Sequence, residues 1–102
     1  MKEEEAKIKA EILKALANPV RLKIVEELSR VEKCACEMLN IAKVDFSVLS
    51  RHMAQLKNVG IVTERRKGVR IYYRLACPCI LQALECTVGV MRVRARKIKK
   101  AI

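Results

Sequence analysis

The sequence predicts a small, mostly helical α+β domain in which one β-hairpin separates four helices from a fifth. With 102 residues, the chain has the length of a single domain. Apolar residues recur at helical spacing through most of the chain, but residues 61–75 alternate with a period of two around Lys67-Gly68, a turn signal. Hydrophobic residues make up 52% and aromatic residues only 3%, so we expect a folded chain with an aliphatic core.

The first two helices are expected at residues 3–16 and 19–28. In the first, Ile8, Ile12 and Leu16 recur at helical spacing, and three glutamates open it, where negative charge suits the helix dipole. The second helix should begin at Asn18-Pro19, because asparagine caps a helix and proline fits the first helical position.

Two shorter helices are expected next, at residues 34–40 and from Asp45 or Ser47 to about residue 58. A glycine, Gly60, should end the later one. Two short helices joined by a tight turn are typical of a helix-turn-helix. The second of them would direct four apolar side chains to the core: Val48, Leu49, Met53 and Leu56.

Residues 61–66 and 69–75 are rich in β-formers and form the predicted hairpin, and a fifth helix should run from near Pro78 to about residue 99. This order predicts a winged helix-turn-helix in which the two-stranded hairpin is the wing, with residues 1–102 as a single domain. The first and last helices have apolar faces left to cover, so we expect them to pack against a second copy in a homodimer.

The net charge of +11 lies entirely in the second half of the chain. Residues 1–45 carry nine basic and nine acidic residues, and five of the ten residues from 65 to 74 are arginine or lysine. Such a surface favours a polyanion, with double-stranded DNA the leading partner. A membrane surface fits less well, because strand and turn signals interrupt the basic stretch.

We expect a cytoplasmic protein. No apolar run approaches the roughly 18 residues of a membrane span. The acidic start, Met1-Lys2-Glu3, does not resemble a signal peptide.

Three segments resemble a known family: Leu16–Val25, Ser50–Leu56, and Gly60-Ile61-Val62 with the hairpin residues 66–75. In order and spacing they are similar to the arsenic-repressor (ArsR/SmtB) family, over roughly residues 10–76. The resemblance implies a homodimeric repressor that leaves its operator when it binds a metal or metalloid ion. Some members of the family sense oxidants or persulfides through cysteine pairs instead.

The predicted DNA contacts lie on the second helix of the helix-turn-helix and on the hairpin. A recognition helix presents polar side chains to base edges, and a basic hairpin contacts phosphates or the minor groove. A plain solvated helix face with His52 partly buried is the alternative, and the basic hairpin beside it favours DNA. The candidate residues are Ser47, Ser50, Arg51, His52 and Gln55 on the helix and Arg66, Lys67 and Arg70 on the hairpin.

The chain has five cysteines and one histidine, which excludes multi-histidine metal sites. A reducing cytosol and an odd cysteine count argue against a disulfide framework, so metal binding or redox sensing is the hypothesis to test. Thiolate ligands favour As(III), Cd, Pb, Cu(I) or Zn. A free cysteine is often a small buried hydrophobe, and this alternative stays open for Cys86.

The first pair, Cys34-Ala35-Cys36, should begin the third helix and resembles the Cys-x-Cys of arsenic, cadmium and lead sensors. Leu39 stands where some members of the family have a third cysteine. Residues i and i+2 of a helix point about 200° apart, so both thiolates could hold one ion only if this turn distorts.

The second pair, Cys77-Pro78-Cys79, stands where members with a site on the fifth helix carry Asp-x-His. A helix N-terminus there should lower the thiol pKa. Cys86 lies about 10 Å further along the helix, so it could join only with a partner helix. Three thiolates suit trigonal As(III) and favour this cluster, whereas the first pair lies nearer the recognition helix. The sequence does not decide between them, or between two sites, one shared site and a regulatory disulfide.

These observations favour a repressor that leaves its operator on binding As(III) or a soft divalent ion, without an organic cofactor. The alternative is a redox or persulfide switch on the same winged-helix fold. An enzyme such as a thiol–disulfide oxidoreductase is disfavoured, because the chain has no Cys-x-x-Cys and no βαβ unit.

Overall fold

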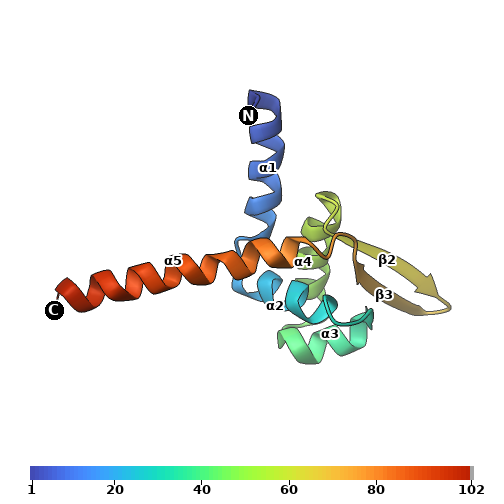
Figure 1. Cartoon of the computed structure of the whole chain (residues 1–102). Coiled ribbons are helices and arrows are strands. Elements are labelled where there is room, and N and C mark those ends of the chain that lie inside the picture. The colour runs from blue at the N-terminus through green and yellow to red at the C-terminus, as the bar shows by residue number, and fades with distance from the viewer. Residues whose placement is uncertain (102) are drawn as a thin grey trace.

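The computed structural model describes the backbone of residues 1–101 and the side chains of residues 1–98. The elements follow one another as α1 (Glu3–Leu16), α2 (Pro19–Leu28), β1 (Lys33–Cys34), α3 (Ala35–Ala42), α4 (Phe46–Asn58), β2 (Val62–Lys67), β3 (Arg70–Leu75) and α5 (Ile80–Ala101). In Figure 1, α1 and α5 project from a body built of α2, α3, α4 and the sheet, and the β2–β3 hairpin projects in another direction. This is the predicted winged helix-turn-helix.

Local capping explains where the helices begin and end. The side-chain oxygen of Asn18 accepts hydrogen bonds from the backbone N–H groups of Val20 (2.9 Å) and Arg21 (3.2 Å) at the start of α2. Asp45 caps α4 in the same way, accepting from the Val48 N–H at 2.9 Å. Lys43, in the left-handed region with φ 55°, ends α3 and forms the turn of the helix-turn-helix.

The sheet has three antiparallel strands in the order β1-β3-β2, so the prediction of a two-stranded sheet was incomplete. The strand β1 is only two residues long and pairs Cys34 with Tyr72 of β3. A strand this short has no periodicity that a sequence pattern could reveal. The hairpin turn is Gly68-Val69, one residue later than expected, and Gly68 has the positive φ of 64° that such turns favour.

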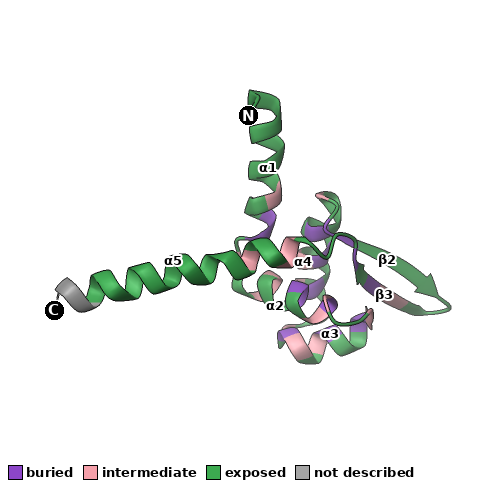
Figure 2. Ribbon diagram, viewed as in Figure 1, coloured by how far each residue is buried: buried purple, intermediate pink, exposed green. Residues whose placement is uncertain are grey.

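The core lies between α2, α3, α4 and the sheet, where Figure 2 shows most of the buried ribbon. It is aliphatic, as predicted, with Tyr73 its one buried aromatic residue within the part of the chain that the structure describes. The largest side chains fully removed from water are Ile24, Val25, Met38, Leu49, Leu56 and Val62.

Helices α1 and α5 are mostly exposed in the single chain (Figure 2). Only Ala15 and Leu16 of α1 are buried, while Ile8 is 54% and Val90 61% exposed. Helix α5 begins at Ile80, two residues later than predicted, because residues 77–79 form a turn before it. Within the described residues, none of the helices has the length and apolarity needed to cross a membrane.

Candidate nucleic-acid interface and cysteine pairs

The outer face of α4 is polar because the apolar residues of the helix recur on its other side. Leu49, Met53 and Leu56 are buried against the core. Asp45, as the cap, accepts a hydrogen bond from the Ser47 hydroxyl at 2.8 Å, which orients that side chain. Four of the predicted DNA-contacting side chains are exposed on this face: Ser47, Ser50, Arg51 and Gln55.

His52 is half-buried, and its Nδ1 faces α2. The Nε–H of Arg21 donates to this nitrogen at 3.0 Å, and another N–H of Arg21 donates to the Ala15 carbonyl at 3.2 Å. Burial, followed by the positive charges of Arg21 and Arg51, holds the pKa of His52 below its ordinary value. The neutral ring with an unprotonated Nδ1 therefore anchors the recognition helix to α2, and DNA contact by its other nitrogen stays a prediction.

The hairpin carries one paired cation, Arg65, and three unpaired cations toward its tip, while Arg74 is exposed near its base without a described ion pair. At its base, Arg65 pairs with Glu32 at 3.0 Å and lies over the Tyr72 ring at 5.0 Å from the centroid, and Lys57 of α4 pairs with Glu64 at 2.8 Å. Toward the tip, three exposed cations form no ion pair with any described carboxylate: Arg66, Lys67 and Arg70. These unpaired charges are available to an external anion.

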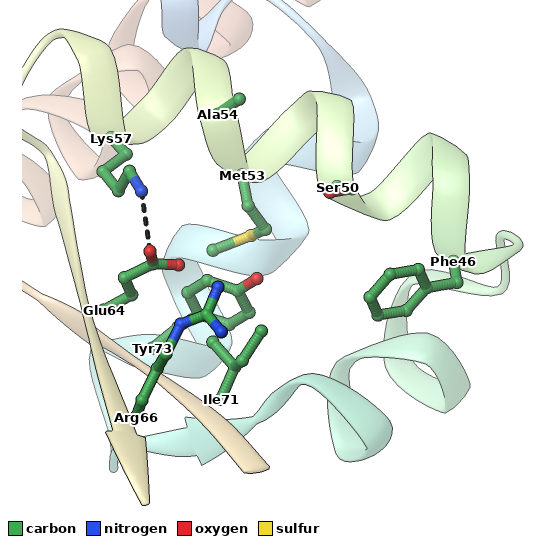
Figure 3. A pocket seen from close by; sticks show the side chains of 9 residues that line it. All are labelled: Phe46, Ser50, Met53, Ala54, Lys57, Glu64, Arg66, Ile71 and Tyr73. Atoms are coloured by element: carbon green, nitrogen blue, oxygen red, sulfur yellow. Dashed lines mark hydrogen bonds and ion pairs between the residues drawn. The ribbon is translucent and has the colours of Figure 1, made fainter. Parts of the chain in front are cut away.

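A hollow of about 210 Å³ lies between the recognition helix and the hairpin. Figure 3 shows Phe46 and Ser50 of α4 on one side of it and Arg66 of β2 on the other, with Ile71 and Tyr73 of β3 between them. The polar face of α4 and the cationic hairpin therefore border one concave surface.

Cys34 and Cys36 are joined by a disulfide in the structure, with their Cα atoms 5.4 Å apart. The expectation that a helical turn would keep these side chains apart was wrong, because Cys34 lies before α3 with an extended backbone (φ −79°, ψ 159°). The disulfide also differs from the expectation that these cysteines are reduced thiols. Cys34 is buried and Cys36 is exposed, so the disulfide links a residue of the core to a residue on the surface.

A second hollow, of about 230 Å³, lies beside this first cysteine pair. Its walls come from three elements: α3, the start of α4 and the hairpin. The lining side chains besides the cysteines include Leu39, Phe46, Val69, Arg70 and Ile71. The pair therefore borders a hollow that is also lined by both elements predicted to bind DNA.

The second pair lies in the exposed turn before α5, with the sulfur atoms of Cys77 and Cys79 3.0 Å apart. The hydrogen bond shared with Cys77, which stabilises the neutral Cys79 thiol, and the repulsion a charged Cys77 would exert raise the pKa of Cys79 above its ordinary value. The predicted lowering of this thiol pKa was wrong, because Cys79 lies outside the helix and beside a second thiol. Cys86 is exposed on α5.

The described part of the chain contains no group of three or more cysteine, histidine or carboxylate side chains arranged to hold a metal ion. A three-thiolate site is therefore not assembled within one chain. Two contributors to the site were missed by the sequence analysis: Arg21, which orients His52, and Phe46, which begins α4. Phe46 could have been found, since it is the chain's one phenylalanine and stands between two polar capping residues.

Comparison with known proteins supports this picture. The family model "Bacterial regulatory protein, arsR family" matches residues 18–64. The chain is 41% identical over 66 residues to the "HTH-type transcriptional repressor SmtB" of Mycobacterium tuberculosis, covering 65% of this chain and 49% of that protein. It is 38% identical over 65 residues to the "Arsenic resistance transcriptional regulator ArsR1" of Pseudomonas putida, covering 63% and 51%. The chain thus spans about half the length of these curated relatives.

Solved structures match over nearly the whole chain. The crystal structure of Rv0081 from M. tuberculosis superposes with a TM-score of 0.80 at 32% identity, covering 95% of this chain and 99% of that one. A solution structure of the homodimeric winged helix-turn-helix DNA-binding domain of Mb0332 from Mycobacterium bovis, a possible ArsR-family regulator, has a TM-score of 0.75 at 29% identity, covering 93% of both chains.

Proposed function

The chain belongs to the arsR family of bacterial regulatory proteins, and from this premise we propose that it is a homodimeric transcriptional repressor, not an enzyme. It binds double-stranded operator DNA and is released from it by a thiophilic metal or metalloid ion. As(III) is the favoured effector, followed by Cd, Pb or Zn. The observation that carries the proposal is the exposed polar face of α4 beside three unpaired cations toward the tip of the hairpin.

In the DNA complex, α4 enters the major groove and the hairpin lies along the backbone. Ser47, Ser50 and Gln55 offer hydrogen bonds to base edges, and Arg51 is suited to a bidentate contact with guanine. The hairpin cations bind phosphate, so affinity falls as salt rises.

The dimer forms through α1 and α5. Both helices expose apolar side chains in the single chain, including Ile8, Leu13, Val90, Met91 and Val93. The homodimeric state of the Mb0332 domain supports this arrangement. Two copies present two recognition helices, which suits an operator with two half-sites.

The cysteine pairs are the proposed sensors. Thiolates prefer soft ions, and the similarity to a relative named for arsenic resistance supports As(III) as the first choice. The hollow that Cys34 and Cys36 share with α4 and the hairpin supports this pair as the inducing site. Cys77, Cys79 and Cys86 remain the alternative, with the third thiolate coming from a second copy.

A second candidate function is a redox or persulfide switch. The disulfide between Cys34 and Cys36 and the 3.0 Å separation of the Cys77 and Cys79 sulfurs support it, since both pairs can interconvert between thiol and disulfide without rearranging the fold.

DNA binding is tested with an operator duplex selected from random sequences, followed by fluorescence anisotropy. Arg51→Ala should weaken specific binding by about 1–3 kcal/mol, and Lys67→Ala should weaken specific and non-specific binding alike. Lys7→Ala, which removes an exposed charge on α1, is the control and should leave affinity unchanged. Unchanged affinity for Arg51→Ala would contradict the proposed orientation of α4.

The effector is tested by adding arsenite, Cd(II) or diamide to the reduced protein. Thiolate-to-metal absorbance with a fixed stoichiometry and loss of DNA binding supports the metal-responsive repressor. A reversible disulfide without metal stoichiometry supports the redox switch. Cys34→Ser/Cys36→Ser and Cys77→Ser/Cys79→Ser identify the pair, and release of DNA by arsenite from a cysteine-free variant would exclude thiolate sensing.

A further inference from the structure

We propose that Phe46, the first residue of the recognition helix, selects thymine in the operator by packing its ring against the methyl group on carbon 5 of the base. The inference rests on the proposed function and adds a residue that determines which base pair is preferred. The side chains assigned above to the base edges recognise bases through hydrogen bonds instead, and they are Ser47, Ser50, Arg51 and Gln55.

Phe46 lies where a helix-turn-helix reads bases. It follows the cap Asp45 and begins α4. The N-terminal residues of a recognition helix are the ones that contact base edges in the major groove. A shallow, open depression of about 590 Å³ lies on the outer surface of α4, and its lining residues are Phe46, Ser47, Ser50, Arg51 and Ala54. The ring therefore borders the same surface as the polar side chains proposed to face the bases.

The fold itself leaves much of this ring in water. Figure 3 shows Phe46 at the start of α4, beside the hollow between this helix and the hairpin, yet the residue is 54% exposed. The core side of α4 is complete without it, because Leu49, Met53 and Leu56 are buried and Phe46 lies outside the core cluster. An aromatic side chain exposed on a largely polar surface gains free energy when an apolar group covers it.

The charges around the ring favour DNA as the molecule that covers it. Arg51 shares the outer surface of α4 with Phe46, and Arg66 stands across the hollow from it. Neither arginine has an ion pair with a described carboxylate, so the neighbourhood of the ring is cationic and attracts a polyanion. An apolar partner protein would have to desolvate both charges without neutralising them.

The major groove narrows the contact to one chemical group. Its base edges carry hydrogen-bond donors and acceptors together with a single kind of apolar group, the methyl of thymine. Phenylalanine makes apolar contact with that methyl. Phe46 therefore distinguishes thymine from cytosine and from the purines by a property that the polar side chains of α4 do not read.

The spacing on the helix limits where this thymine lies. Phe46 and Arg51 are five residues apart, which is about 7.5 Å along an α-helix. Successive base pairs are about 3.4 Å apart along the duplex. The thymine should therefore lie within about two to three base pairs of the pair that Arg51 reads, and Arg51→Ala identifies that pair by relaxing specificity there.

The test removes single methyl groups from the DNA. In an operator duplex selected from random sequences, each thymine is replaced in turn by deoxyuridine, which lacks the methyl group and keeps every hydrogen-bonding group. The reduced, metal-free protein is titrated with each duplex at one salt concentration, and fluorescence anisotropy gives the affinity. At one thymine in each half-site the replacement should weaken binding about fourfold, as expected when one methyl group is no longer removed from water.

Substitutions at Phe46 assign the effect to the ring. Phe46→Ala and Phe46→Gln should bind the thymine and deoxyuridine duplexes equally well at that position, whereas Phe46→Leu, which stays apolar, should keep most of the preference. Val69→Ala, at a fully exposed valine of the hairpin tip, is the matched control and should keep the full preference. A purely structural role for Phe46 would weaken binding to both duplexes by the same factor. Circular dichroism checks that each variant is folded.

The same thymine preference in the wild type and in Phe46→Gln would overturn the inference, and so would an operator in which no methyl group near the Arg51 base pair affects affinity. Failure of the proposed function is seen separately. If no duplex is preferred over random DNA, the proposed function is contradicted, whereas sequence-specific binding without an effect of the methyl group contradicts the inference alone.

Discussion

The contact between Arg21 and His52 should stabilise the protein only while the histidine is neutral. The Nε–H of Arg21 donates to Nδ1 of His52 at 3.0 Å, and this is the described side-chain hydrogen bond that joins α2 to the recognition helix. A protonated His52 has no acceptor at Nδ1 and would bring a third positive charge to Arg21 and Arg51. We therefore predict a coupling energy between the two side chains that depends on pH.

The magnitude follows from a double-mutant cycle of Arg21→Ala, His52→Ala and the double variant. A partly buried hydrogen bond contributes about 0.5–1.5 kcal/mol, and the cycle cancels the separate loss of the Arg21 bond to the Ala15 carbonyl. We expect a coupling of about 1 kcal/mol at pH 8. Because folding lowers the pKa of His52, the unfolded chain binds its proton first, so stability falls as pH drops below the ordinary value of 6.5.

Urea unfolding followed by circular dichroism measures the four proteins at pH 8 and pH 5, at one protein concentration because a dimer unfolds in a concentration-dependent way. The coupling should be present at pH 8 and weaker at pH 5, where protonation begins to remove the acceptor. A coupling of the same size at both pH values, or none at pH 8, would refute the assignment of Nδ1 as the acceptor.

Three further predictions concern stability and assembly. Asp45→Ala removes the cap of α4 and should lower the free energy of unfolding at pH 7. The loss should shrink in acid, since hydrogen bonds from Val48 and Ser47 hold the Asp45 pKa below 3.8, and a pH-independent loss would contradict the cap. Met38→Ala, at a fully buried position, should cost about 2–5 kcal/mol in urea unfolding, and a smaller loss would mean that the core collapses around the gap. Val90→Glu should shift the protein toward monomer in sedimentation, and an unchanged dimer would exclude this part of α5 from the interface.

The sequence predicted the helices well where periodicity and capping agreed. The first helix was expected at residues 3–16 and the second at 19–28, and both have these bounds in the structure. In α2, Asn18 and Pro19 act locally, so no knowledge of the fold was needed to place its start. The buried side of α4 was largely predictable, because one helix fixes the spacing of Leu49, Met53 and Leu56. The prediction that Val48 faces the core was wrong, since Val48 is only half-buried and lies outside the core cluster.

The parts that could not be predicted depend on contacts between distant segments. Strand β1 has two residues and forms only because it pairs with β3, in which Tyr73, the partner of Lys33, lies 40 residues later in the chain. The same pairing keeps Cys34 out of the helix, which overturned the argument that its sulfur and that of Cys36 point apart. The bond from Arg21 to His52 spans 31 residues and likewise has no local signal.

The two cysteine pairs would act on DNA binding by different routes. Cys34 is opposite Tyr72 in β3, and Tyr72 lies under Arg65, the neighbour of the hairpin cation Arg66. The first pair is therefore joined to the hairpin through β1 and shares a hollow with the start of α4 within one chain. The second pair lies at the other end of the hairpin. Cys77 follows Leu75, the last residue of β3, and Leu75 is about 17 Å along the strand from Arg70 at the hairpin tip.

A ligand at the second pair would therefore act through the start of α5, the helix proposed to hold the two copies together. Its effect would be a change in the spacing of the two recognition helices. A duplex with a single half-site separates the two routes, because spacing has no influence when only one recognition helix is bound. Inhibition that persists on the half-site assigns sensing to Cys34 and Cys36, and inhibition that appears only on the full operator assigns it to the pair before α5.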